Sequence, residues 1–224
     1  MIENLKELVV KLNNWNNAER FKEVLAEIRD IPAEDAQETA LYILKGNAEY
    51  GLGLFEDSLN SYAGAIKIDP TDAPARSNYG SVLYALGRYI DGLNACDSAL
   101  MLDATFVPAY INAAHCLIGL EQNGVAGEYL MKAIENAKNN VGFCVIVADM
   151  LTDLGMYERA KEAYFKIARF AGAPVDIHEK IAEFFKRARE NGIEKATIVK
   201  DVNAWRSEFV KNPDVFKLST PFLQ

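Results

Sequence analysis

The chain has 224 residues, half of them hydrophobic, with 24 basic and 32 acidic side chains and a net charge of −8. Residues 1–110 carry 9 basic and 17 acidic residues, whereas residues 111–224 carry 15 of each. An acidic front half disfavours nucleic acid and anionic membranes as partners. No stretch approaches the ~18 uncharged apolar residues of a membrane helix, and the start lacks the pattern of a secretory signal. We therefore expect a cytoplasmic protein without membrane insertion.

Residues 1–38 predict a pair of helices. Ile2, Leu5, Leu8, Val9 and Leu12 recur at helical spacing, and a polar run over 13–17 interrupts the pattern. A second apolar stripe follows over 21–28, and the proline at position 32 marks its end. We interpret 1–38 as a degenerate N-terminal capping pair, because terminal repeats are usually atypical.

Residues 39–174 contain one pattern written four times, over 39–72, 73–106, 107–140 and 141–174. The pattern therefore has a period of 34, which separates Gly46 from Gly80 and also Gly53 from Gly87. Each copy predicts two helices joined by a tight turn, where glycine supplies positive φ. A fixed period of this length indicates a helical repeat array.

A set of small residues recurs at this period where two helices are expected to approach closely. Large residues alternate with them, as interlocking antiparallel helices require. The structural repeat residues are Gly46, Gly80, Ala114, Ala148 and Ala182 in the first helices, and Ala65, Ala99 and Ala133 in the second helices.

Residues 175–210 predict a degenerate C-terminal pair that opens with a capping-box-like start at Asp176 and Glu179. The tail over 211–224 has no helical stripe, yet Val215, Phe216 and Phe222 make it too apolar for an ordinary disordered end. We favour a cap over the last helix pair. The alternative is that the tail docks on a neighbouring molecule and makes homo-oligomers.

The segments AEYGLGLFEDSLNSYAGAIKIDP and VLYALGRYIDGLNACDSALMLD resemble tetratricopeptide repeats. The frequent tryptophan of that family is replaced here by Tyr42, Arg76, Tyr110, Cys144 and His178, and the terminal proline is kept only at Pro70. The resemblance implies an all-α fold: a right-handed α-solenoid of about five to six antiparallel helix pairs. It also implies a concave groove, lined by the first helices, that holds a peptide.

Mapping this groove onto the chain selects neutral polar and aromatic residues for peptide contact. Asn78 and Asn112 lie one full period apart, and an amide suits any peptide backbone. Tyr50 and Tyr84 have the same spacing and resemble interface anchors. The alternative is that these are ordinary solvated helix faces. The predicted groove residues are Asn47, Tyr50, Ser77, Asn78, Ser81, Tyr84, Asn112, His115 and Asp149.

The groove lacks the lysine and arginine cluster with which one subfamily clamps chaperone C-termini, so we expect no affinity for such acidic ends. No catalytic residue, metal site or cofactor is predicted: no phosphate loop, GxSxG or HExxH motif occurs, and the three cysteines lack zinc spacing. We therefore predict a non-enzymatic protein–protein interaction module, such as an adaptor, assembly factor or chaperone. The alternatives are the substrate-recruiting region of a larger enzyme, such as a transferase, and a self-assembling structural scaffold.

Overall fold

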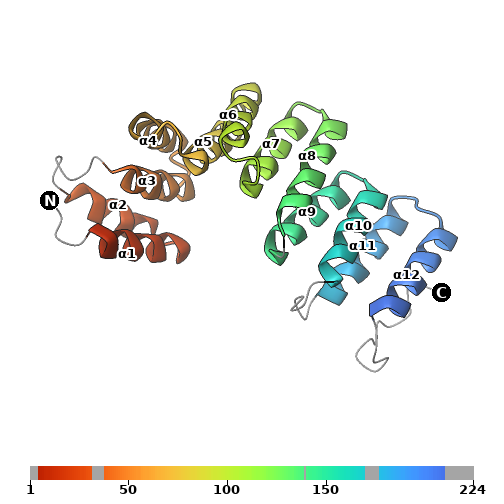
Figure 1. Ribbon diagram of the computed structural model, residues 1–224. Coiled ribbons are helices and arrows are strands. Elements are labelled where there is room, and N and C mark those ends of the chain that lie inside the picture. Colours follow the sequence, from red (N-terminus) through yellow and green to blue (C-terminus); the bar gives the residue numbers. More distant parts are fainter. Residues whose placement is uncertain (1–4, 32–37, 139, 170–176, 210–224) are drawn as a thin grey trace. The chain divides into compact units, whose positions relative to one another are not determined.

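The computed structural model describes residues 5–31, 38–138, 140–169 and 177–209, and all its regular elements in these ranges are helices (Figure 1). The predicted all-α solenoid fold is confirmed. The apolar tail over 211–224 lies outside the described residues. The helices are α1 (Leu5–Asn17), α2 (Phe21–Arg29), α3 (Thr39–Gly51), α4 (Phe55–Ile68), α5 (Ala73–Ala85), α6 (Tyr89–Leu102), α7 (Val107–Gly119), α8 (Asn123–Asn136), α9 (Val141–Asp153), α10 (Tyr157–Ala168), α11 (Ile177–Glu190) and α12 (Lys195–Phe209).

The chain divides into two compact units, Met1–Ala126 and Gly127–Gln224, which we name unit 1 and unit 2. In unit 1, α3 packs on α4, α5 on α6, and α5 also on α7. In unit 2, α9 packs on α10 and α11 on α12. In these pairs a helix contacts one that is next or next but one along the chain, which is how a solenoid builds its core without a central layer.

The turns within the helix pairs use the left-handed backbone region. Gly53, Gly87 and Gly155 have φ of 74°, 74° and 69° at the ends of α3, α5 and α9. After each glycine the chain bonds back to the helix it has left; for example, Arg88 N donates to Leu83 O at 2.8 Å. Glu121 takes the same conformation after α7, with φ of 60°, although a side chain disfavours it.

The small repeat residues lie where the helices of a pair approach. A Cβ atom on Gly80 would stand 2.6 Å from Cys96 Sγ and 2.8 Å from Gly92 O, so only glycine fits there without a shift. A Cβ on Gly46 would stand 3.0 Å from the Tyr62 ring. The eight positions are all buried: Gly46, Gly80, Ala114, Ala148, Ala182, Ala65, Ala99 and Ala133.

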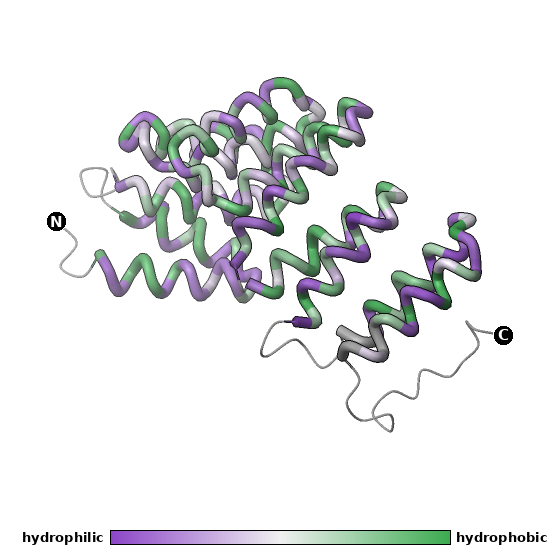
Figure 2. Tube along the Cα trace, turned by 45° about the vertical axis from the view of Figure 1, so that its right-hand side comes forward, coloured by the Kyte–Doolittle hydropathy of each residue, from purple (hydrophilic) through white to green (hydrophobic). Residues whose placement is uncertain are grey.

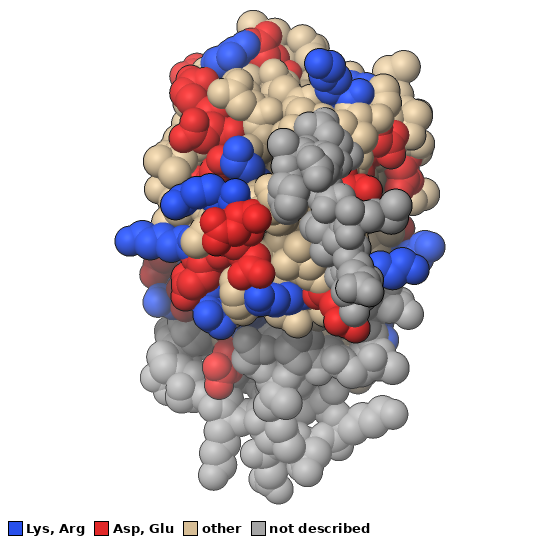
Figure 3. All heavy atoms as spheres, turned by 90° about the vertical axis from the view of Figure 1, so that its left-hand side faces the viewer, with Lys and Arg blue, Asp and Glu red and all other residues tan. Residues whose placement is uncertain are grey.

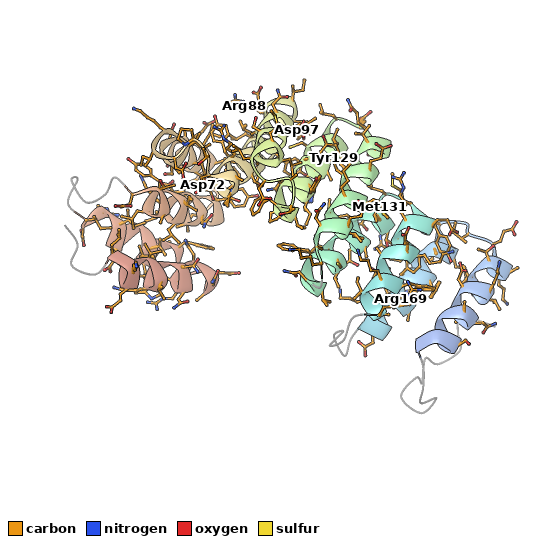
Figure 4. The ribbon with its side chains drawn as sticks, viewed as in Figure 1. Asp72, Arg88, Asp97, Tyr129, Met131 and Arg169 are labelled. Carbon is orange, nitrogen blue, oxygen red and sulfur yellow. The ribbon has the colours of Figure 1, made fainter. Side chains whose placement is uncertain are left out.

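Hydropathy follows the helix period, since apolar and polar residues alternate along each tube in Figure 2. In unit 1, α1, α2 and α3 share a core built on Leu12, Val24 and Leu41. Asp72 begins α5 by accepting a hydrogen bond from Ala75 N at 2.6 Å (Figure 4). α2 has nine residues, whereas the equivalent α4 and α6 have 14 each.

Candidate functional site

The predicted groove residues of unit 1 lie on α3, α5 and α7, the first helices of three successive pairs. Asn47 Oδ1 on α3 accepts a hydrogen bond from Tyr62 Oη and lies 3.5 Å from Asn78 Nδ2 on α5. The amide of Asn78 therefore links the first helices of two successive pairs. Because its nitrogen faces Asn47, its carbonyl oxygen is left to other donors.

Asn112 also links two successive first helices, one pair further along. Its Nδ2 lies 3.0 Å from Ser77 Oγ and 3.2 Å from Ser77 O, which ties α7 to α5. Asn112 Oδ1 has no donor among the residues that the structure describes. Asn78 and Asn112 thus present carbonyl oxygens at equivalent positions of successive repeats, each held by a neighbour.

Ser77 differs from the other predicted contact residues, because its side chain is 0% exposed. It faces inward and accepts the amide of Asn112. We therefore remove Ser77 from the proposed contact surface. The sequence mapping included it because one residue of rotation along a helix moves a side chain by about 100°.

The aromatic members of this face are packed against one another along unit 1. The Tyr84 and His115 rings are stacked, with centroids 5.4 Å apart and planes 30° apart, and the Tyr89 ring lies 5.7 Å from that of Tyr84. Tyr50 packs on Phe55 at 5.5 Å and remains 39% exposed. Such fixed, partly exposed rings lose little conformational entropy on binding.

Sequence reasoning missed two glycines that pack against aromatic rings in unit 1. A Cβ on Gly119 would stand 2.7 Å from the Tyr89 ring, and one on Gly51 would stand 2.4 Å from the Phe21 ring. In both cases the aromatic residue begins a second helix, and the glycine ends the first helix of the next pair. The spacing between aromatic residue and glycine is the same in the two cases, and that recurrence was the available signal.

We call these residues the first-helix face of unit 1. None of them carries a charge near neutral pH, because burial lowers the pKa of His115 below its ordinary value and keeps the imidazole neutral. The face is therefore a polar but uncharged surface with aromatic rings. Its members are Asn47, Tyr50, Asn78, Ser81, Tyr84, Asn112 and His115.

The remaining predicted groove residue, Asp149, belongs to unit 2 and has different surroundings. It accepts a hydrogen bond from Tyr164 Oη and lies 3.7 Å from Lys180 Nζ. One turn further along α9, Asp153 pairs with Arg187 of α11, and this contact raises the pKa of Arg187. The first helices of unit 2 thus contact each other through paired charges, where those of unit 1 use amides.

Two features associated with other functions are missing from the described residues. No group of three or more His, Cys, Asp or Glu side chains is placed to hold a metal ion there. In the same ranges, no helix combines the length and apolar character that crossing a membrane requires.

The chain matches two models of tetratricopeptide repeats, one over residues 46–87 and one over residues 107–140. No curated protein sequence matches it. Among solved structures, a thermophilic TPR protein of Thermus thermophilus is 16% identical, with a TM-score of 0.65 over 81% of this chain and 97% of its own. PilF of Pseudomonas aeruginosa is 16% identical, with a TM-score of 0.61 over 89% of this chain and 95% of its own. YrrB, described as a TPR protein with an unusual peptide-binding site, is 20% identical, with a TM-score of 0.52 over 78% of this chain and 90% of its own. These similarities concern the fold.

Proposed function

Because this chain is a tetratricopeptide repeat protein, we propose that it is a non-enzymatic protein-interaction module whose first-helix face of unit 1 binds an extended peptide. The observation that carries the proposal is the amide pair Asn78 and Asn112. Each amide nitrogen is held by a neighbour, and each carbonyl oxygen is free of donors within the described residues. Preoriented acceptors at repeated positions suit the N–H groups of an extended backbone.

The aromatic rings of the same face supply the apolar part of such an interface. Tyr50 and the stacked Tyr84 and His115 offer flat area with polar tips, which is typical of residues that dominate binding energy. Their packing on Phe55 and Tyr89 holds them in place before a ligand arrives.

Charge defines the class of peptide. The first-helix face of unit 1 has no basic residue, and residues 1–110 carry 17 acidic against 9 basic side chains. An acidic peptide would meet repulsion without a compensating cation. We infer that the ligand is neutral or basic and is held mainly through its backbone. An adaptor, assembly factor or chaperone of the cytoplasm would use such a surface.

The test is a pull-down from the source cell with crosslinking and mass spectrometry, comparing the wild type with the Asn78→Arg/Asn112→Arg variant. Bulky cations at these positions should abolish capture of the peptide-bearing partner. The matched control is Asn60→Arg/Asn94→Arg, which places the same substitutions one period apart on exposed positions of α4 and α6. Capture that survives in the Asn78/Asn112 variant would overturn the proposal.

Loss of folding has to be separated from loss of binding, because Asn112 also ties α7 to α5. Circular dichroism and thermal melting of each variant provide that check. Tyr50→Ala is a second probe, since Tyr50 is exposed and its removal should weaken binding by about tenfold or more with little change in stability.

A further inference from the structure

α2 is shorter than the helices that occupy the same place in the next two pairs. α2, α4 and α6 begin at Phe21, Phe55 and Tyr89, but α2 ends after nine residues and the others after 14. Pro32 accounts for the early end, because proline disfavours a helical residue before it and donates no hydrogen bond. About one and a half turns are thus missing from the end of α2.

The following pairs show what those turns do. In the second half of α6, Ala99 packs on Ala73 of α5 and on Ala109 in the first turn of α7. The residue of α3 equivalent to Ala109 is Leu41, two periods earlier. Leu41 has no such helical turn above it, although it is buried in a core against which Ile31 packs, and a pocket lies beside this core.

The pocket has a volume of about 400 Å³ and lies between α2 and α3. Leu25, Ile28 and Leu41 form its apolar part, with the ring of Tyr42 beside them. Its volume is within the range of about 300–1,000 Å³ of ligand-binding pockets. It is therefore large enough to take more than one side chain of a partner.

The mouth of this pocket is cationic. Arg29 and Lys45 line it, and no described residue forms an ion pair with Arg29. Among the described lining residues the one carboxylate is Glu49, which is 5% exposed, accepts a hydrogen bond from Ser61 Oγ at 2.6 Å and forms an ion pair with Lys45 Nζ at 3.6 Å. Figure 3 shows acidic and basic side chains intermixed over this end of the molecule.

We propose that this α2/α3 pocket docks an amphipathic helix of a protein partner, with an acidic residue beside its apolar stripe. The partner helix supplies the turns that α2 lacks. Its apolar side chains cover the half-buried Leu25, Ile28 and Tyr42, and its carboxylate meets Arg29 and Lys45. A helix fits better than a strand because both neighbours are helices, whose ridges and grooves accept a third helix.

The pocket is separate from the first-helix face of unit 1. On α3, Tyr42 and Asn47 are separated by five positions, which places them about 140° apart around the helix axis. A peptide on the face and a helix in the pocket therefore use different sides of α3. The two proposals can fail independently.

The test uses two blocked peptides, each about four helical turns long, and fluorescence anisotropy with the full chain. One peptide has leucine at helical spacing flanked by glutamate, and the other has lysine in place of glutamate. The glutamate peptide should bind at least about tenfold more tightly than the lysine peptide. The Arg29→Glu/Lys45→Glu variant should lose that preference or reverse it.

Net charge alone is controlled by Lys67→Glu/Arg88→Glu. This variant changes the charge by the same amount at exposed sites of unit 1, and Figure 4 labels Arg88, the residue that precedes α6. It should bind the glutamate peptide within about threefold of the wild type. Because glutamate at position 45 would stand near Glu49, the Arg29→Gln/Lys45→Gln variant is measured as well, and an intermediate loss is expected.

Four outcomes would overturn the proposal. The glutamate peptide could fail to bind the wild type. The two double charge reversals could have equal effects, or hydrogen exchange could show protection outside 21–31 and 38–49. A concentration-dependent mass that Arg29→Glu/Lys45→Glu abolishes would instead assign the pocket to a second copy of the chain. Asn78→Arg/Asn112→Arg should leave the peptide affinity unchanged.

Discussion

Unit 1 and unit 2 repeat the same helix pair, yet they treat the same positions differently. On the first helices, unit 1 has Asn47 and His115 where unit 2 has Asp149 and Glu183. Across successive first helices, unit 1 uses the neutral amides of Asn78 and Asn112 and the stack of Tyr84 on His115. Unit 2 instead pairs Asp149 with Lys180 and Asp153 with Arg187. A repeat therefore keeps its packing residues while its exposed first-helix positions are free to diverge in chemistry.

The same contrast holds inside the helix pairs. At the closest approach unit 1 has Gly46, Gly80 and Ala114, while unit 2 has Ala148 and Ala182. In unit 1, Cys96 Sγ and the backbone of Gly92 occupy the space that a Cβ on Gly80 would need. The α5/α6 pair of unit 1 thus tolerates less bulk at this position than the α9/α10 pair of unit 2, where alanine is present. Four predictions test these differences and are given in order of decreasing effect.

Gly80→Ala should lower the free energy of unfolding by about 2 kcal/mol, because the new Cβ would stand 2.8 Å from a backbone oxygen and force α5 and α6 apart. The opposite change in unit 2, Ala148→Gly, should cost only about 1 kcal/mol through lost helix propensity and a missing methyl. Urea denaturation of both variants measures the difference. Equal costs would contradict the idea that the glycine is specific to unit 1.

Asp201→Ala should destabilise the end of unit 2 by about 2 kcal/mol. Asp201 Oδ2 accepts hydrogen bonds from Tyr157 Oη at 2.9 Å and Lys161 Nζ at 3.0 Å, so it ties α12 to α10. Amide hydrogen exchange should accelerate in α12 and remain unchanged in α3 to α7. Asp201→Asn serves as the control, since it retains an acceptor for Tyr157. Uniform acceleration across both units would refute the local role.

His115 should make the stability of unit 1 depend on pH below about 7. Burial lowers its folded pKa below the unfolded value of about 6.5, so its contribution is fully present above that value. Stability is lost as the pH falls toward the folded pKa, because the unfolded chain takes up the proton first. His115→Gln should flatten this part of the profile, measured as melting temperature against pH. An unchanged slope of melting temperature against pH in this variant would show that carboxylates alone cause the pH dependence.

Glu121→Gly should raise the free energy of unfolding by up to about 1 kcal/mol. Glu121 has φ of 60° where the equivalent turns have Gly53, Gly87 and Gly155, so glycine would relieve the strain. The reverse substitution, Gly87→Glu, should cost a similar amount. Thermal melting should show a higher melting temperature for Glu121→Gly and a lower one for Gly87→Glu. Two shifts in the same direction would contradict the idea that Glu121 is strained.

Much of the architecture could be predicted from the sequence because its signals are local. Turn glycines, apolar stripes and small residues at a period of 34 specify each pair from within a few dozen residues. The candidate site was less accessible. Asn78 and Asn112 were identified by their spacing, but their partners were not, and Ser77 was placed on the surface although it is buried.

By itself, then, the sequence determined that this protein is an array of helix pairs, and where its close contacts lie. Three features could be identified only in the folded chain. They are the hydrogen bonds of the first-helix amides, the paired charges of unit 2, and the pocket that the short α2 leaves beside Arg29 and Lys45. The reason is the distance along the chain over which each interaction acts. A turn or a small residue acts on its own helix pair, whereas these contacts depend on how far successive helices are rotated and on where each of them ends.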